Sequence, residues 1–209
     1  MKQILCFGDS NTYGYIPKTG KRYDWGVRWT SILNEELGLD SYRVIEEGLC
    51  GRTTIFEDPL RDGRRGTGLL PVLLETHGHP DIIVVMLGTN DCKAVYGATP
   101  EIIGKGISKI INQIHTYSKK SRILLISPIH LGERVWEEGY DTEFSKSSVE
   151  TSKGLADVYK KISKREDVYY LDASRYSKPS EADQEHMDET GHKALAFAVL
   201  SKIREIEAA

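Results

Sequence analysis

The chain has 209 residues, of which 39% are hydrophobic and 28% are charged, and its formal net charge is −3. This length suits one domain, so we expect residues 1–209 to form a single domain. The slight negative charge argues against a nucleic-acid-binding protein, and no apolar run approaches the ~18 residues of a membrane span. Three cysteines without metal-ligand spacing, and a start without signal-peptide character, predict a cytoplasmic protein.

Short apolar runs separated by helical patterns organise the whole chain. The runs that predict β-strands are residues 3–7, 42–46, 82–87, 122–126 and 168–171. Most are continuous rather than alternating, which is typical of parallel strands buried on both faces. Apolar stripes at helical spacing begin at Trp29, Ile103, Leu155 and Leu195, with Thr99 and Asp188 as expected N-caps. The alternation predicts a three-layer α/β/α sandwich around a five-stranded parallel sheet.

Two segments depart from this regular pattern, residues 15–26 and residues 131–148. Each follows the carboxyl end of a predicted strand, so each is expected to overhang the crevice where α/β folds place their chemistry. The second segment carries Trp136, Tyr140 and Phe144 among polar residues. A wall of the substrate site and a contact between subunits are both open interpretations of these aromatic residues.

Ser10 directly follows the first predicted strand, after Gly8 and Asp9. A serine at this place in an α/β chain faces the crevice at the carboxyl edge of the sheet. Its hydroxyl can attack an acyl carbon only when a base takes its proton and donors hold the developing oxyanion. Asp9 is expected to support the turn through hydrogen bonds to the backbone.

His186 is the best candidate for that base among the six histidines. It lies three residues after Asp183, and this spacing brings both side chains to one side of a turn. A carboxylate there can fix the imidazole tautomer and stabilise the imidazolium formed during attack. His192, further along, is expected on the outer face of the last helix.

Asn90 and Gly51 follow the third and second predicted strands and can supply oxyanion donors. Asn90 offers a side-chain NH₂ group, and Gly51 offers a backbone N–H that no Cβ obstructs. Ordinary turn chemistry explains either residue on its own. Arg52 and Asp91 are expected to brace the two loops that present them.

Four ordered segments of this chain resemble the conserved blocks of the SGNH (GDSL-type) hydrolases. They are Gly8–Thr12, Gly48–Thr54, Gly88–Asp91 and Asp183–His186. The likeness is closest to the arylesterase/acyltransferase branch and extends over residues 4–192. It implies a flavodoxin-like sheet and neither an obligatory cofactor nor a metal.

The resemblance also implies the roles of individual residues. Ser10 would be the nucleophile, His186 the base and Asp183 the group that orients the base. The oxyanion hole would comprise the Ser10 and Gly51 N–H groups and the Asn90 side chain. These roles imply a serine esterase that acts on short acyl esters, acetyl esters above all. Water or an alcohol would complete the reaction from an acyl-Ser10 intermediate.

The expected partner is therefore a small-molecule ester. We expect the substrate to contact Asn11, Tyr15, His130 and Trp136. Members of this branch commonly form oligomers, so a homo-oligomer is expected, with residues 136–144 as a candidate interface.

Two other functions compete with the esterase. In a metal-dependent phosphoesterase a divalent ion would be held at the same strand ends, by Asp9, Asp91, His130, Asp183 and His186. In a flavin-binding module, residues 10–14 would form a phosphate loop after the first strand, although the carboxylate of Asp9 would repel a phosphate.

Overall fold

The computed structural model describes all 209 residues. Its core is a sheet of five parallel strands in the order β2-β1-β3-β4-β5. The strands are β1 (Lys2–Gly8), β2 (Tyr42–Gly48), β3 (Ile82–Met86), β4 (Arg122–Ser127) and β5 (Tyr169–Asp172). The five predicted strands are confirmed, and their order is that of the flavodoxin-like folds.

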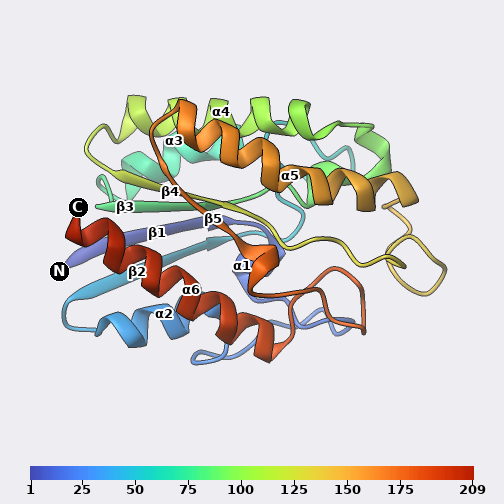
Figure 1. Cartoon of the computed structure of the whole chain (residues 1–209), viewed down its shortest axis with the longest axis horizontal. Coiled ribbons are helices and arrows are strands. Elements are labelled where there is room, and N and C mark those ends of the chain that lie inside the picture. The colour runs from blue at the N-terminus through green and yellow to red at the C-terminus, as the bar shows by residue number, and fades with distance from the viewer.

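The chain has six α-helices, and five of them cover the two faces of this sheet. They are α1 (Ser10–Tyr13), α2 (Trp29–Leu37), α3 (Gly66–Thr76), α4 (Pro100–Tyr117), α5 (Lys146–Arg165) and α6 (Glu189–Ala208). Short 3₁₀ turns are η1 (Asn90–Cys92), η2 (Ala94–Tyr96) and η3 (Ala173–Arg175). Helices α3, α4 and α5 lie on one face, and α2 and α6 lie on the other (Figure 1). The predicted three layers are thus confirmed.

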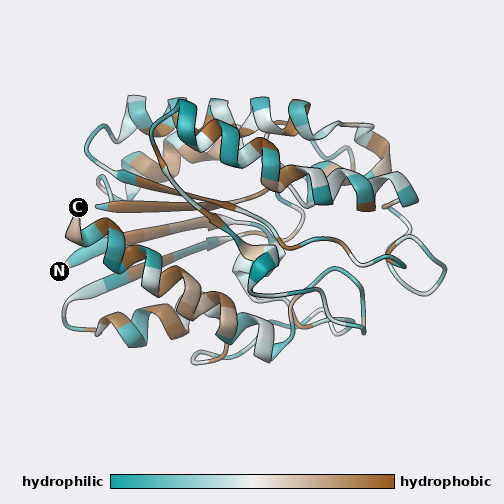
Figure 2. Ribbon diagram, viewed as in Figure 1, coloured by the Kyte–Doolittle hydropathy of each residue, from teal (hydrophilic) through white to brown (hydrophobic).

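Side chains of each central strand enter two separate cores. From β1, Leu5 and Phe7 pack under α3, α4 and α5, whereas Ile4 and Cys6 pack against α2 and α6. Figure 2 shows the strands as a hydrophobic layer between helices whose outer faces are hydrophilic. This double burial explains why the strands are continuous apolar runs.

No helix is both long enough and apolar enough to span a bilayer.

The expected caps are present on the long helices. Thr99 Oγ1 accepts from Ile102 N at 3.4 Å at the start of α4, with Pro100 in the first helical position. Asp188 Oδ1 accepts from Gly191 N at 2.8 Å at the start of α6. Each cap satisfies an amide that the first turn of a helix leaves free.

Helix α3 was not among the predicted helices, because its sequence contains residues that usually interrupt helices. Pro71 lies inside it and cannot donate to the carbonyl oxygen of Thr67, four residues earlier. The side chain of Gln113 in α4 donates to that oxygen at 2.7 Å. A hydrogen bond between two helices therefore replaces the one that proline removes.

The expectation for His192 is wrong, because its side chain is fully buried between α6 and α2. Its Nδ1 accepts from Trp29 N at 3.3 Å, at the first residue of α2, where the N-cap residue Arg28 provides no side-chain cap. Burial, with a smaller contribution from the charge of His186, lowers the pKa of His192 to about 4. The neutral imidazole thus serves as the cap of α2.

We expect this histidine to make stability depend on pH. Between about pH 6.5 and pH 4 the unfolded chain binds a proton at His192 that the folded protein does not bind. The free energy of unfolding should therefore decrease as the pH falls through this window, by up to ~3 kcal/mol. Urea unfolding of the wild type and of His192→Asn, which keeps an acceptor without titrating, should show a weaker pH dependence in the variant. The exposed His115→Asn serves as control, and equal slopes in all three proteins would contradict this account.

Candidate active site

The candidate site lies in a crevice at the carboxyl edge of the sheet, between β1 and β3. The chain leaves β1 toward α2 on one face and leaves β3 toward α4 on the other, so the connections diverge here. Such a switch point is where open α/β sheets bind ligands. Ser10 follows β1 and Asn90 follows β3. The loops that surround the crevice lie on the opposite side of the molecule from both termini (Figure 1).

A tight turn fixes the backbone of Ser10. Asp9 Oδ1 accepts from Asn11 N at 3.0 Å, so the expected support of the turn by Asp9 is confirmed. The turn also packs directly against the end of β2, where a Cβ on Gly48 would lie 2.1 Å from Tyr13 N. Burial raises the pKa of Asp9 to about 6, although the N–H of Asn11 opposes that rise.

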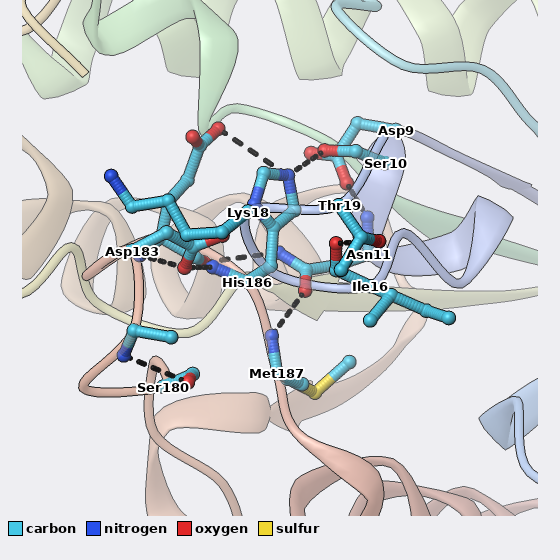
Figure 3. A network of polar contacts seen from close by, with 12 residues as sticks. Asp9, Ser10, Asn11, Ile16, Lys18, Thr19, Ser180, Asp183, His186 and Met187 are labelled. Atoms are coloured by element: carbon cyan, nitrogen blue, oxygen red, sulfur yellow. Dashed lines mark hydrogen bonds and ion pairs between the residues drawn. The ribbon is translucent and has the colours of Figure 1, made fainter. Parts of the chain in front are cut away.

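Three side chains from distant parts of the chain form one line of hydrogen bonds (Figure 3). His186 Nε2 lies 2.8 Å from Ser10 Oγ, across 176 residues of sequence. On the other side of the ring, His186 Nδ1 lies 2.8 Å from Asp183 Oδ2. Asp183 Oδ1 accepts from the N–H groups of Glu185 and His186 at 3.1 and 2.9 Å. The carboxylate therefore orients both the imidazole and the turn that carries it.

The two ionisable members of this line support each other's charged forms. Burial would raise the pKa of Asp183, but the hydrogen bonds and charge of His186 outweigh burial and hold that pKa below its usual value. Burial would lower the pKa of His186, but the charges of Glu185 and Asp183 outweigh burial and raise it. The site thus favours an imidazolium, the species that forms when His186 takes a proton.

The three residues expected to supply oxyanion donors, Ser10, Gly51 and Asn90, line one cavity. Asn90 Nδ2 donates to Arg52 O at 3.1 Å, which orients the amide, and its second N–H is not used in that bond. The backbone N–H groups of Ser10 and Gly51 have no acceptor within the protein. Gly51 has a φ of +82°, a backbone conformation that residues with a Cβ rarely adopt. The arrangement can accept a negative oxygen beside Ser10 Oγ.

Two buried charged residues hold the loops that present these donors, as predicted. Arg52 Nη1 donates to Gly8 O at 2.9 Å and also contacts Glu47 O. Both carboxylate oxygens of Asp91 accept from Thr54 N, each at 3.0 Å. Burial raises the pKa of Asp91 to about 7, against the lowering effect of the bonds from Thr54.

Asn11 connects the serine turn to the histidine segment (Figure 3). Its Oδ1 accepts from Met187 N at 3.0 Å, and its Nδ2 donates to Glu185 O at 3.4 Å. The side chain is buried and does not line the cavity. Glu185 and Met187 are the chain neighbours of His186, so these two hydrogen bonds fix the backbone of His186 relative to Ser10.

The cavity beside Ser10 has a volume of about 150 Å³. Of the residues named from the sequence, it is lined by Ser10, Tyr15, Gly51, Asn90 and His186. The ring of Tyr15 lies against that of His186, with a centroid separation of 4.4 Å. Residues that the sequence analysis missed also line it, namely Cys50, Arg61, Lys93, Asp141, Glu143 and Glu185. Several had a signal in the sequence: Asp141 and Glu143 belong to the 131–148 segment expected to overhang the crevice, and Cys50 and Glu185 adjoin Gly51 and His186.

His130 and Trp136 are not among the lining residues. Trp136 is 38% exposed, and its Nε1 donates to Glu133 O at 3.0 Å. Contact of the substrate with Asn11, His130 and Trp136 therefore stays a prediction.

The residues of the competing metal site are engaged elsewhere. Asp183 and His186 bond to each other, and Asp91 bonds to Thr54. No group of three or more His, Cys, Asp or Glu side chains is arranged to hold a metal ion.

The model of the GDSL-like lipase/acylhydrolase family matches residues 6–194. The chain belongs to this family, also called the SGNH hydrolases, and it is a carboxylic ester hydrolase. No curated protein matches the chain.

Solved structures extend this likeness over the whole chain. The aryl esterase of M. smegmatis is 32% identical, with a TM-score of 0.90 over 98% of this chain and 99% of that one. A carbohydrate acetylesterase family member from Sinorhizobium meliloti is 33% identical, with a TM-score of 0.93 over 100% of both chains. A lipase/acylhydrolase from Enterococcus faecalis, 20% identical with a TM-score of 0.71 over 98% of this chain and 96% of that one, shares the fold.

We expect Asn11→Ala to lower both stability and esterase activity. The change leaves Met187 N–H and Glu185 C=O without their partner, which costs about 1–3 kcal/mol for each buried group. It also releases the segment that carries His186. Thermal unfolding and ester hydrolysis measure the two effects, and the exposed Asn112→Ala in α4 is the matched control. Full activity in a stable Asn11→Ala protein would contradict the role of this contact.

Proposed function

We propose that this protein is a serine esterase that hydrolyses short-chain acyl esters, acetyl esters above all, through a covalent acyl-Ser10 intermediate. The observation that carries the proposal is the line of two 2.8 Å contacts from Asp183 through His186 to Ser10, beside a small cavity. In this arrangement His186 takes the proton of Ser10 as the hydroxyl attacks the ester carbon. Asp183 stabilises the imidazolium that results.

The same groups carry out the remaining steps of acylation and then deacylation. The tetrahedral oxyanion would accept hydrogen bonds from Ser10 N, Gly51 N and Asn90 Nδ2. His186 then gives its proton to the leaving alcohol, and the C–O bond to that alcohol breaks. Water then attacks the acyl carbon while His186 takes one of its protons, and His186 returns that proton to Ser10 Oγ as the bond between Oγ and the acyl carbon breaks and the acid leaves. An alcohol in place of water completes an acyl transfer by the same steps.

The size of the cavity supports a small acyl group. Its volume of about 150 Å³ is well below the roughly 300–1,000 Å³ of pockets that enclose drug-sized ligands. The two similar structures are named an aryl esterase and a carbohydrate acetylesterase family member, which supports ester substrates with small acyl groups.

The position of Tyr15 in the wall of the cavity, against the ring of His186, supports its contact with the substrate. The exposed Trp136 supports the segment around it as a contact between copies of a homo-oligomer. Three free cysteines support a reducing, cytoplasmic location.

Replacement of the nucleophile or the base should remove nearly all turnover. We expect Ser10→Ala and His186→Ala each to lose about 10⁶-fold in kcat on p-nitrophenyl acetate, because either change disables the whole line of groups.

A fluorophosphonate should label Ser10 in the wild type. A chelator should leave activity unchanged, whereas a metal-dependent phosphoesterase would lose it. A flavin-binding module would give coloured protein with unlabelled Ser10. A loss below tenfold in a folded Ser10→Ala protein would overturn the proposal.

Asn90→Ala tests the oxyanion donors separately. We expect kcat to fall by about 10²–10³-fold with little change in KM, because the amide contacts the oxygen most strongly in the transition state. The control is Asn112→Ala, which removes an amide far from the crevice. An increase in KM alone would assign Asn90 to ground-state binding instead.

A further inference from the structure

The side chain of Glu185 is a buried carboxyl that the proposed mechanism does not use. It is 7% exposed and lines the cavity beside Ser10. Its one polar contact joins Oε1 to His186 Nε2 at 3.7 Å, on the same ring nitrogen that faces Ser10 Oγ. A carboxyl that faces the cavity, close to the nitrogen of the base that contacts Ser10, can act on that base.

We propose that Glu185 is a positioning residue that acts through His186, as a second carboxylate on the Nε2 side of the ring, and sets the pH above which the base is available. The inference rests on the proposed function of Ser10 and His186. The imidazole then lies between two carboxyls with different tasks. Asp183 accepts a hydrogen bond from Nδ1 and so fixes the tautomer. Glu185 and Nε2 compete for one proton.

Burial and four neighbouring charged groups determine the protonation of the Glu185 carboxyl. Burial, aided by the charges of Asp141 and Asp183, raises the pKa of Glu185 to about 7 against the lowering effect of His186 and Lys93. Lys93 itself is engaged, since its Nζ lies 2.7 Å from Glu143 Oε2. The imidazole is the cation that lies within 4 Å of the Glu185 carboxyl.

Glu185 and His186 consequently share protons near neutral pH. With one proton on the pair, the ionised carboxylate favours an imidazolium, which cannot accept the proton of Ser10. The base becomes available when the pair loses this last proton, at a pH that belongs to both groups together. Once the base is free, the same carboxylate stabilises the imidazolium that forms when the Ser10 proton moves to Nε2.

Removal of the negative charge should make His186 a base at lower pH. In Glu185→Gln the neutral amide no longer stabilises the imidazolium, so the acid limb of kcat/KM should shift to lower pH. We expect a shift of about one unit, the low end of what a charge within ~4–6 Å produces. At pH values below the wild-type limb, the variant should thus keep about tenfold more of its own plateau activity.

Two further variants separate this effect from a structural one. Glu185→Asp keeps a carboxylate but withdraws it by one methylene, so its acid limb should lie between those of the wild type and Glu185→Gln. Glu181→Gln makes the same change in charge on the same segment, at an exposed position outside the cavity, and should leave the limb in place.

The pH dependence of Ser10 labelling by a fluorophosphonate gives a second readout that needs no ester substrate. Absence of labelling in the wild type would overturn the proposed function itself. Labelling of wild type and Glu185→Gln with the same pH midpoint would overturn only the role of Glu185. If circular dichroism shows that Glu185→Gln does not fold, an unchanged midpoint in Glu185→Asp overturns it equally.

Discussion

The contact between His186 Nε2 and Ser10 Oγ is the constraint on which the arrangement of the site depends. It joins the end of β1 to the segment before α6, and the sequence separation of 176 residues gives no local means of holding it. Parallel strands solve the problem, because their carboxyl ends meet at one edge of the sheet whatever their order along the chain. Asn11 then fixes the remaining freedom by bonding to the backbone on both sides of His186.

The buried charged residues around this contact mostly bind backbone groups rather than one another. Asp91 accepts from Thr54 N, Asp183 accepts from two N–H groups, and Arg52 donates to carbonyl oxygens. Each of these bonds fixes a loop at the crevice and partly compensates the cost of burying the charge. In such a weakly solvated place, the remaining donors interact more strongly with a developing oxyanion than they would in water.

Much of the fold followed from the sequence, because the strands buried on both faces leave a clear apolar signal. The proximity of Ser10, Asp183 and His186 also followed, from the resemblance to the SGNH hydrolases and from the place of Ser10 at the end of the first strand. The missed features depend on contacts that sequence patterns do not contain. Helix α3 includes Pro71 and needs a side chain from α4 to replace a lost bond, and His192 is polar yet fully buried. Periodicity describes which faces are apolar but does not describe such exceptions.

Two carboxyls near one imidazole show how environment separates residues of the same chemistry. Asp183 accepts three hydrogen bonds, and together with the charge of His186 these keep its pKa low despite burial. Glu185 accepts none, and its pKa rises to about 7. Asp183 therefore stays ionised throughout the neutral range, whereas Glu185 shares its titration with His186 there. A fixed charge suits the group that orients the base, and a titrating one suits a group that controls when the base is available.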